Sequence, residues 1–223
     1  MRMCLWMLSV PGRSANAGVA ATEHQRRVWD KHAPSYDGQM GLLERLLFEG
    51  GRAWVCSRAS GDVLEVAVGT GRNLPLYPEG IRLTGIELSP EMLTIARRRA
   101  RELGLDDNLQ QSDAQALPFL DASFDTVVCT FALCCIPDDR KAVAEMKRVL
   151  RPGGRLLLVD HVPSTSRLLR DIQWLLEQMT ARLEGVYILR RSLDIVRAEG
   201  FEIETSERSK AGIVERVLAR KPA

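Results

Sequence analysis

A chain of 223 residues with 45% hydrophobic residues is long enough to bury one substantial core, and it falls within the range of a single domain. Its 31 basic and 29 acidic side chains leave a net charge of only +2, so no strong field marks nucleic acid or an anionic membrane as the partner. The five cysteines are irregularly spaced, without a CxxC pair or a histidine at metal-ligand spacing. This pattern favours free thiols in a reducing compartment and no metal centre.

Residues 1–21 are expected to form a disordered leader. Arg2, the apolar run at residues 3–10 and Ala-Asn-Ala at residues 15–17 imitate a secretory signal, and a start codon placed too early is a further alternative. The apolar run is at the lower limit of a signal core, so we favour a cytoplasmic protein. No other uninterrupted apolar run has the length of a membrane span, so any membrane contact is expected to be peripheral.

Two helices are predicted ahead of the first strand. Thr22 as a cap, followed by residues 23–31, indicates the first helix. Residues 40–57 carry apolar side chains at helical spacing, which indicates the second. Residues 22–57 are thus expected to cover the sheet.

After this cover, short β-branched runs alternate with helical patterns. Strands are expected at residues 62–68, 81–87, 108–113, 124–130 and 155–161. Helices are expected from residue 73 and at residues 89–103 and 138–150, with a turn at residues 151–154 formed by proline and glycine. The alternation predicts a mostly parallel sheet with helices on both faces.

The pattern changes near the C-terminus. A helix at residues 192–199 precedes two strands at residues 201–207 and 213–220. Because only residues 208–212 lie between these strands, there is too little chain for a crossover helix. We expect an antiparallel hairpin at the sheet edge.

A glycine-rich turn follows the first predicted strand. Residues 65–71 read Glu-Val-Ala-Val-Gly-Thr-Gly. Glycine lets the backbone approach a ligand closely, and a following helix N-terminus offers unpaired N–H donors. Taken alone, this pattern is equally typical of plain loop geometry.

The acidic residue at the end of the second strand is more informative. Glu87 is placed where a carboxylate can accept hydrogen bonds from both hydroxyls of a ribose, as it does in dinucleotide enzymes. The turn, however, reads E-x-A-x-G-x-G and not G-x-G-x-x-G. This difference favours a nucleoside ligand that has no pyrophosphate.

Five sequence blocks occur in an order that is more specific than any one of them. They are Val-Leu-Glu-Val-Ala-Val-Gly-Thr-Gly-Arg-Asn-Leu at residues 63–74, Gly-Ile-Glu-Leu-Ser-Pro-Glu-Met-Leu at 85–93, Asp-Ala-Gln-Ala-Leu-Pro-Phe at 113–119, Phe-Asp-Thr-Val-Val at 124–128 and Leu-Arg-Pro-Gly-Gly at 150–154. Together they resemble the class I S-adenosylmethionine-dependent methyltransferases, and within that class the ubiquinone/menaquinone C-methyltransferase and bacterial phosphatidylethanolamine N-methyltransferase group. The resemblance runs from about residue 28 to residue 163.

This resemblance implies an α/β fold with a Rossmann-like, seven-stranded, mostly parallel sheet, a C-terminal antiparallel hairpin strand, helices on both faces and an N-terminal helical cover. It implies one methyltransferase domain over residues 22–223. Within it, residues 58–163 would form the cofactor-binding core, residues 164–190 an acceptor-site insertion and residues 191–223 the sheet edge. The implied cofactor is S-adenosyl-L-methionine, and its product is S-adenosyl-L-homocysteine.

The resemblance also implies the residues of the cofactor site. These are Tyr36, Glu65, Ala67, Gly69, Gly71, Asn73, Glu87, Leu88, Met92, Asp113, Ala114, Thr130 and Phe131. Glu65 is expected near the ammonium group of the cofactor, Glu87 at the ribose hydroxyls and Asp113 near the adenine amino group. Without the other blocks, Glu65 and Asp113 would read as solvated strand ends. Similarly, a methionine on a helix, such as Met92, is usually a core residue.

One position departs from the family. Ala67 stands where the family usually has glycine, so its methyl group is expected to narrow the pocket or shift the turn. Alanine is small, and we expect binding to be retained.

Two residues are candidates for a catalytic role. Tyr36 lies in a segment, residues 29–37, that resembles the part of the family closing over the cofactor; the alternative is a helix end and turn made by Pro34 and Gly38. His161 ends the fifth predicted strand, at the edge where open α/β sheets bind ligands. It is expected either to act as a general base or to orient a loop.

The acceptor is expected to meet residues outside the cofactor motifs. The candidates are His32, Cys134, His161, Arg167, Trp174 and Tyr187. For the adjacent Cys134 and Cys135, packing as small buried hydrophobes is favoured over thiol chemistry. The arginines at residues 97–101 are similarly interpreted as a solvated helix face.

The predicted function is methyl transfer to a small hydrophobic or lipid-like acceptor. Transfer from a sulfonium is an in-line displacement, so holding the reactants at the right distance and angle supplies most of the catalysis. Two alternatives stay open. One is an RNA or protein methyltransferase, which the neutral charge disfavours. The other is an enzyme that retains the cofactor and catalyses a rearrangement or cyclisation.

Overall fold

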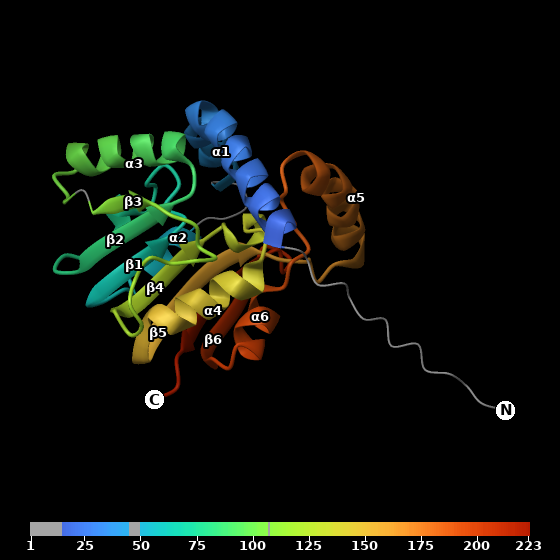
Figure 1. The fold of residues 1–223 in the computed structure, drawn as a ribbon. Coiled ribbons are helices and arrows are strands. Elements are labelled where there is room, and N and C mark those ends of the chain that lie inside the picture. Colours follow the sequence, from blue (N-terminus) through green and yellow to red (C-terminus); the bar gives the residue numbers. More distant parts are fainter. Residues whose placement is uncertain (1–14, 45–49, 107) are drawn as a thin grey trace.

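The computed structural model describes residues 15–44, 50–106 and 108–223, which form a seven-stranded sheet with helices around it (Figure 1). The strand order is β3-β2-β1-β4-β5-β7-β6. The strands are β1 (Asp62–Val66), β2 (Arg82–Glu87), β3 (Leu109–Gln111), β4 (Phe124–Thr130), β5 (Leu150–His161), β6 (Glu202–Ser209) and β7 (Val214–Arg220). The predicted α/β fold is confirmed.

The directions of the strands show which edge of the sheet can bind a ligand. β1 pairs in parallel with β2 and β4, and β5 pairs in parallel with β4. β7 is antiparallel to both β5 and β6, so the predicted hairpin is confirmed, with β6 as the edge strand. The carboxyl ends of β1, β2, β4 and β5 therefore meet at one edge of the sheet, where open α/β sheets bind their ligands.

Helices cover both faces and one end of the sheet. The described helices are α1 (Ala15–Leu43), α2 (Gly51–Cys56), α3 (Pro90–Glu102), α4 (Asp139–Val149), α5 (Arg167–Leu183) and α6 (Ser192–Ala198), with the 3-10 turns η2 (Leu74–Leu76) and η3 (Leu133–Cys135). α4 and α6 pack on one face, α2 on the other, and α1 lies between α3 and α5 at the end of the sheet (Figure 1).

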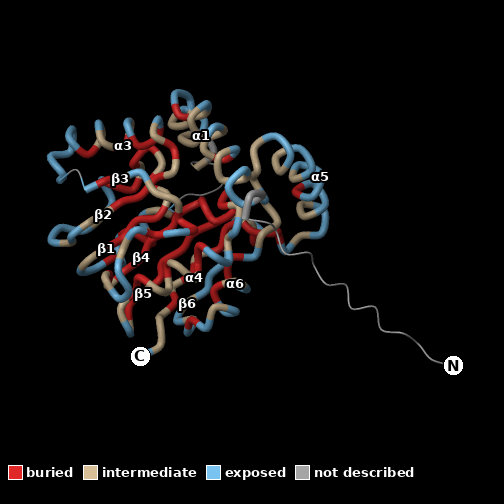
Figure 2. The backbone as a smooth tube through the Cα atoms, in the orientation of Figure 1, coloured by how far each residue is buried: buried red, intermediate tan, exposed pale blue. Residues whose placement is uncertain are grey.

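The core follows the two-residue period of the strands. In β1, Leu64 faces the α4 side and Val63 the α2 side, and in β5 Leu158 and Leu157 alternate in the same way. All four side chains are buried, and each is worth roughly 1.5–3 kcal/mol relative to exposure. Buried residues concentrate in the central strands (Figure 2), which gives the ligand edge a rigid support.

The N-terminal cover differs from the prediction. α1 begins at Ala15 and passes through Thr22, so Thr22 is not a helix cap; its hydroxyl instead accepts a hydrogen bond from Gln115 Nε2 at 3.0 Å. The expected domain boundary at residue 22 thus lies inside a helix, and residues 1–14 lie outside the described residues. Pro34 lies within α1, so the alternative of a helix end at that point is wrong.

Three further local predictions were wrong. The helix predicted over residues 40–57 is not continuous, because Gly50 has φ +73° and α2 begins only after it. The helix predicted from residue 73 is the single 3-10 turn η2, where the next residues include Pro75 and Pro78. The turn predicted at residues 151–154 is an irregular start of β5, since Phe124 pairs with Leu150 but Thr126 with Arg155.

Gly69 and Gly71, in the glycine turn after β1, lead to a prediction about the free energy of unfolding. Both have positive φ, but a Cβ on Gly71 would lie 2.8 Å from Leu74 Cδ1 and 3.2 Å from Ala96 Cα, whereas none of the described atoms lies within 4 Å of one on Gly69. Gly71→Ala should therefore lower the free energy of unfolding by about 3 kcal/mol and Gly69→Ala by about 1 kcal/mol. Urea unfolding of the two variants checks this, and equal losses would show that the contacts with Leu74 and Ala96 carry no cost.

Candidate cofactor site

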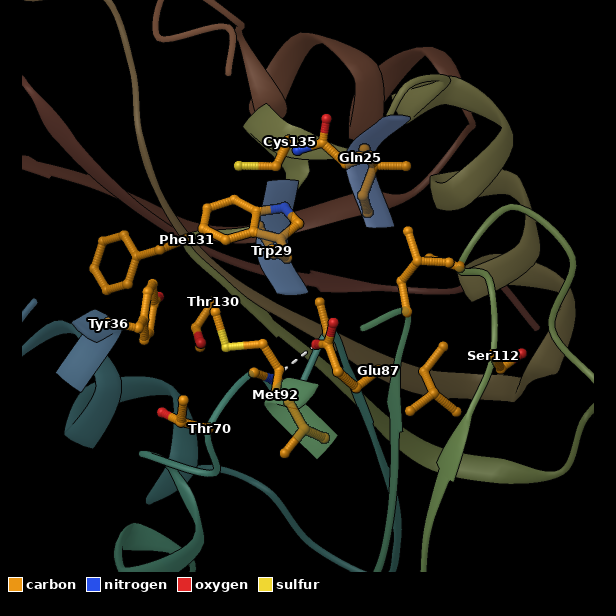
Figure 3. A pocket seen from close by; sticks show the side chains of 18 of the residues that line it. Gln25, Trp29, Tyr36, Thr70, Glu87, Met92, Ser112, Thr130, Phe131 and Cys135 are labelled. Carbon is orange, nitrogen blue, oxygen red and sulfur yellow. Dashed lines mark hydrogen bonds between the residues drawn. The ribbon is translucent and has the colours of Figure 1, made fainter. Parts of the chain in front are cut away.

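A cavity lies at the carboxyl edge, where α1 crosses the ends of β1, β2 and β4. It encloses about 790 Å³ of free space, part of it open to solvent, which is in the range of small-molecule sites. Its lining residues are Gln25, Trp29, Tyr36, Arg52, Ala67, Val68, Gly69, Thr70, Arg72, Ile86, Glu87, Leu88, Met92, Ser112, Asp113, Ala114, Thr130, Phe131, Ala132, Cys135, Ile136 and Pro137. Figure 3 shows Tyr36 and Phe131 at one end, Ser112 at the other and Glu87 between them.

Glu87 at the end of β2 holds the glycine turn. Its Oε2 accepts a hydrogen bond from the Gly69 N–H at 2.8 Å, and its Oε1 accepts one from the Ser89 N–H at 2.9 Å. Burial raises the pKa of Glu87, although these backbone hydrogen bonds oppose the shift. Each carboxylate oxygen can still accept a further hydrogen bond. Glu87 therefore fixes the turn and also presents acceptors to the cavity.

α1 is held over the cavity by half-buried polar contacts. Asp37 accepts hydrogen bonds from the Thr70 hydroxyl at 2.6 Å and from Arg99 at 2.5 Å. Asp30 accepts one at 2.6 Å from the hydroxyl of Ser89, which also caps α3. Burial of Asp37 acts to raise its pKa, but the hydrogen bonds from Thr70 and Arg99 outweigh burial and lower it. These contacts make α1 a fixed cover of the glycine turn.

A half-buried arginine lies at the aromatic end of the cavity. Arg52, in α2, donates to Thr130 Oγ1 at 2.8 Å and to Asn73 Oδ1 at 3.0 Å, and its guanidinium lies 5.2 Å from the centre of the Phe131 ring. Its Nε is paired with Glu44 at 2.7 Å. Arg52 is not predicted from the sequence, because its helix carries no chemical motif and its partners lie far along the chain. The arrangement places a cation on the cavity wall.

Glu65 lies behind this wall. Its Oε1 accepts a hydrogen bond from Asn73 Nδ2 at 2.7 Å and its Oε2 one from the Tyr77 hydroxyl at 2.9 Å. Glu65 is 1% exposed and does not line the cavity. Its burial raises its pKa to about 7, against the opposing effects of Tyr77, Arg52 and Asn73. Glu65 thus positions Asn73, which in turn binds Thr130.

The aromatic end also contains backbone strain. Phe131 has φ +51° and Ala67 has φ +59°, and both line the cavity. A positive φ is uncommon for non-glycine residues and gathers at functional sites. Ala67 therefore occupies a backbone conformation that suits glycine. Tyr36 packs edge-on against Trp29, and burial raises the pKa of Tyr36 to about 12, which keeps it a phenol.

The predicted cofactor residues divide into two groups. Those that line the cavity are Tyr36, Ala67, Gly69, Glu87, Leu88, Met92, Asp113, Ala114, Thr130 and Phe131. Glu65, Gly71 and Asn73 instead support the wall from behind. Among the residues that sequence reasoning missed, Trp29 lies in the segment that had been assigned to the cover. Cys135, beside the predicted Cys134, also lines the cavity.

The predicted acceptor residues do not gather in the cavity. Tyr187 lines a second hollow, together with the first turns of α1 and with Leu88 and Asp113 of the cofactor cavity. Arg167 and Trp174 are exposed on α5 and line neither space. His32 faces Glu184 at 3.6 Å, away from the cavity.

His161 and Cys134 form a cluster beside the cavity. Asp160 accepts hydrogen bonds from the His161 N–H at 2.8 Å and from the Cys134 N–H at 3.3 Å. Burial disfavours a charged imidazole, but Cys134 and the carboxylate of Asp160 favour it more strongly, so the pKa of His161 is raised. A histidine with a raised pKa is a poor proton acceptor at neutral pH. His161 does not line the cavity, so it lies beside the candidate cofactor site and not on its wall.

Comparisons with known proteins agree with this geometry. The family model described as "Methyltransferase domain" matches residues 64–158, which contain the last three residues of β1, all of β4, the glycine turn and Glu87. Residues 64–158 of the chain are thus similar to a methyltransferase domain. Phosphatidylethanolamine N-methyltransferase from Cereibacter sphaeroides is 48% identical over 45% of this chain and 51% of its own length. Demethylmenaquinone methyltransferase from Thermus thermophilus is 38% identical over 59% of this chain and 63% of its own. The chain thus spans between half and two thirds of these relatives.

Solved structures share the fold. A protein from Thermotoga maritima described as a SAM-dependent methyltransferase, possibly a histamine N-methyltransferase, is 22% identical and covers 87% of this chain and 99% of its own, with a TM-score of 0.67. The [4+2]-cyclase SpnF is 23% identical, covers 77% of this chain and 79% of its own, and has a TM-score of 0.62. A methyltransferase and a cyclase thus share this fold. The fold alone does not identify the reaction, which must be inferred from the residues of the site.

The raised pKa of Glu65 predicts a pH dependence of stability. Since its folded-state pKa of about 7 exceeds its ordinary value of 4.5, the stability linked to Glu65 is fully present below pH 4.5 and is lost as the pH rises through 7. Relative to Glu65→Gln, the cofactor-free protein should lose about 3 kcal/mol of unfolding free energy between about pH 4.5 and about pH 8. Urea unfolding across this range measures it. A constant difference between the two proteins would mean that Glu65 keeps an ordinary pKa.

Proposed function

We propose that this protein transfers a methyl group from S-adenosylmethionine to a small hydrophobic or lipid-like acceptor. The observation that carries the proposal is the placing of Glu87 and Arg52 on the wall of one cavity, at positions that suit different ends of one nucleoside amino acid. The relatives described as quinone and phospholipid methyltransferases support the class of acceptor.

The lining residues fit the cofactor part by part. Glu87 would accept hydrogen bonds from the ribose hydroxyls, with Asp113 and Ser112 beside the adenine. The carboxylate of the methionine part would pair with Arg52, the half-buried cation of the wall. Gly69 offers an open approach, since none of the described atoms lies within 4 Å of the Cβ that another residue would have there.

The chain's contribution to the chemistry is positioning. Bound S-adenosylmethionine supplies an electrophilic methyl group on a sulfonium. Tyr36, Trp29 and Phe131 enclose the aromatic end of the cavity, where they exclude water and limit the directions from which an acceptor can approach. Tyr36 stays protonated, because its pKa is about 12, and so can donate a hydrogen bond to an acceptor oxygen or to the cofactor carboxylate.

The acceptor would reach the cofactor through the second hollow, which is lined by Tyr187 and the first turns of α1. Leu88, Asp113 and Pro137 line both spaces, so the hollow continues the cofactor cavity outward between α1 and Tyr187. We therefore place acceptor binding near Tyr187 and Cys135 and not at Arg167 or Trp174.

The proposal is tested by incubating the full-length protein with methyl-labelled S-adenosylmethionine and extracts of bacterial lipids, quinones and soluble metabolites. Label recovered in organic solvent, with one equivalent of S-adenosylhomocysteine released, is the expected result. Label in protein or RNA alone would contradict the acceptor class. A product of unchanged mass, formed without S-adenosylhomocysteine, would contradict methyl transfer itself.

A further inference from the structure

Three side chains of different chemistry meet beside the cofactor cavity. Cys134 lies in η3, which follows β4, and Asp160 and His161 are the last two residues of β5. The thiol sulfur, a carboxylate oxygen and a ring nitrogen of these residues all lie within 4.8 Å of one another. No spacing in the sequence indicates this cluster, since Cys134 and Asp160 are 26 positions apart. The cluster forms because β4 and β5 are parallel neighbours whose carboxyl ends meet.

The end of β5 departs from the arrangement of a regular strand. Successive residues of a strand point to opposite faces of the sheet, so the side chains of Asp160 and His161 would normally diverge. Here His161 Nδ1 lies 4.0 Å from Asp160 Oδ1. The carboxylate is held by hydrogen bonds from two backbone N–H groups, that of His161 at 2.8 Å and that of Cys134 at 3.3 Å. Each of its oxygens has a further lone pair, so the fixed carboxylate can still bind a cation.

A second buried carboxylate lies opposite the first. Glu215 in β7 pairs directly with Asp160 in the antiparallel ladder, so the two side chains are on the same face of the sheet. Oε1 of Glu215 accepts a hydrogen bond from Arg208 Nε at 2.7 Å, but its buried Oε2 has no hydrogen-bond partner among the described residues. Like charges directly opposite each other destabilise a sheet, and the arginine can neutralise one of them. The two carboxylates, 2% and 3% exposed, therefore favour a cation at this place.

We propose that Cys134, Asp160 and His161 bind a divalent transition-metal cation, with Zn²⁺ as the expected ion. Thiolate, imidazole and carboxylate are the ligands of zinc in proteins, whereas Mg²⁺ and Ca²⁺ take oxygen ligands. Bonds of about 2.0–2.3 Å to a tetrahedral Zn²⁺ place its ligand atoms about 3.3–3.8 Å apart. The three groups would need to approach one another by no more than about 1.5 Å to reach that geometry, which rotation of the side chains provides.

The proposed metal site adjoins the wall of the cofactor cavity. Cys135 Sγ lies 3.3 Å from Cys134 Sγ, and Cys135 lines the cavity at the end where Gln25 and Trp29 lie (Figure 3). Three protein ligands leave the fourth position of a tetrahedral ion for water or another ligand. The Tyr187 N–H donates to the Cys134 carbonyl at 2.9 Å, so the ion would also steady the segment where we place acceptor binding. Metal binding does not depend on methyl transfer, and it is measured without cofactor or acceptor.

Equilibrium dialysis of the full-length, reduced protein against ZnCl₂, after treatment with EDTA, tests the proposal. Elemental analysis should find one equivalent of zinc at micromolar free concentration, and excess MgCl₂ should not displace it. CoCl₂ in place of ZnCl₂ should give the charge-transfer absorption of a thiolate bound to Co²⁺, together with the visible bands of a tetrahedral ion. Saturating Zn²⁺ should raise the Tm by about 5 °C, because it binds the folded state.

Variants within the cluster have matched controls outside it. Cys134→Ser should remove the charge-transfer band and weaken zinc binding by at least about 100-fold, since even a partner outside the ligand set is worth about 10- to 100-fold. Cys56→Ser removes another buried thiol, in α2 on the opposite face of the sheet, and should change zinc affinity less than twofold. His161→Ala should weaken binding about as much as Cys134→Ser but keep the charge-transfer band. His32→Ala should leave the affinity unchanged, because His32 faces Glu184 and not the cluster.

The wild-type protein alone can refute the proposed site. Failure to bind zinc at micromolar concentration would overturn it, as would Co²⁺ binding without the charge-transfer band. Zinc affinity that falls equally in Cys134→Ser and Cys56→Ser, or that persists in His161→Ala, would also overturn it. Circular dichroism shows which variants are folded, and if Cys134→Ser does not fold, the comparison of His161→Ala with His32→Ala decides.

Discussion

Glu87→Ala should weaken the binding of S-adenosylmethionine about 100-fold or more. Two charge-assisted hydrogen bonds to the ribose would be lost, each worth about 1.5–3 kcal/mol. The hydrogen bonds from the N–H groups of Gly69 and Ser89 would also disappear, so the glycine turn would be less well fixed before binding. Isothermal titration calorimetry with S-adenosylmethionine and with S-adenosylhomocysteine measures the loss.

Glu91→Ala is the matched control for this variant. Glu91 is an exposed acidic residue in the first turn of α3, close in sequence to Glu87, and it does not line the cavity. We expect its removal to change affinity less than twofold, because a solvated charge at this position is screened. If both variants bound the cofactor as the wild type does, Glu87 would not hold the ribose.

Arg52→Ala should remove the preference for a cofactor with a carboxylate. The wild-type protein should bind S-adenosylmethionine about 30-fold more tightly than its decarboxylated analogue, since an ion pair in a desolvated wall is worth about 2 kcal/mol. In the variant the two affinities should converge on that of the analogue. Arg72 still pairs with Glu44 at 2.8 Å, so the local ion-pair network is not lost entirely.

Two further variants separate charge from packing. Arg52→Lys keeps the cation but not its forked geometry, and it should retain part of the preference. Arg58→Ala removes an exposed arginine that stacks on Trp54 just beyond α2 and should leave both affinities unchanged. A wild-type protein that binds the two ligands equally would show that Arg52 does not meet the carboxylate.

The part of the site that the sequence predicted is the part built from short segments. The ligand-edge residues lie at the ends of β1, β2 and β4. Ala67 directly follows β1, and Glu87 and Thr130 are the last residues of β2 and β4, so all three could be placed from local patterns alone. The core residues of the strands could be predicted locally as well, because successive side chains of a strand point to opposite faces of the sheet. These predictions needed no knowledge of how distant segments meet.

Arg52 could not be found in this way. Its role depends on contacts with Asn73 and Thr130, which lie 21 and 78 positions away along the chain. Helical periodicity places a residue on a face but does not say which distant element that face meets. The break at Gly50 was missed for a related reason, since apolar spacing continued across a glycine whose positive φ interrupts the helix.

The segment containing α5 shows where hydrophobic pattern misleads. Its pattern predicts an acceptor-site insertion over residues 164–190, with Trp174 facing the acceptor. In the structure Gln173 and Glu177 hold backbone groups of the neighbouring loops, so the polar face is the one that packs inward. Composition alone does not distinguish an apolar stripe that faces a pocket from one that faces outward.

The most direct test of the account is a crystal structure of the protein with S-adenosylhomocysteine. We expect the ribose hydroxyls within hydrogen-bond distance of Glu87 and the carboxylate paired with Arg52, with the sulfur directed at the end enclosed by Tyr36 and Phe131. A nucleoside bound elsewhere, or one lying in this cavity with its carboxylate turned away from Arg52, would contradict it.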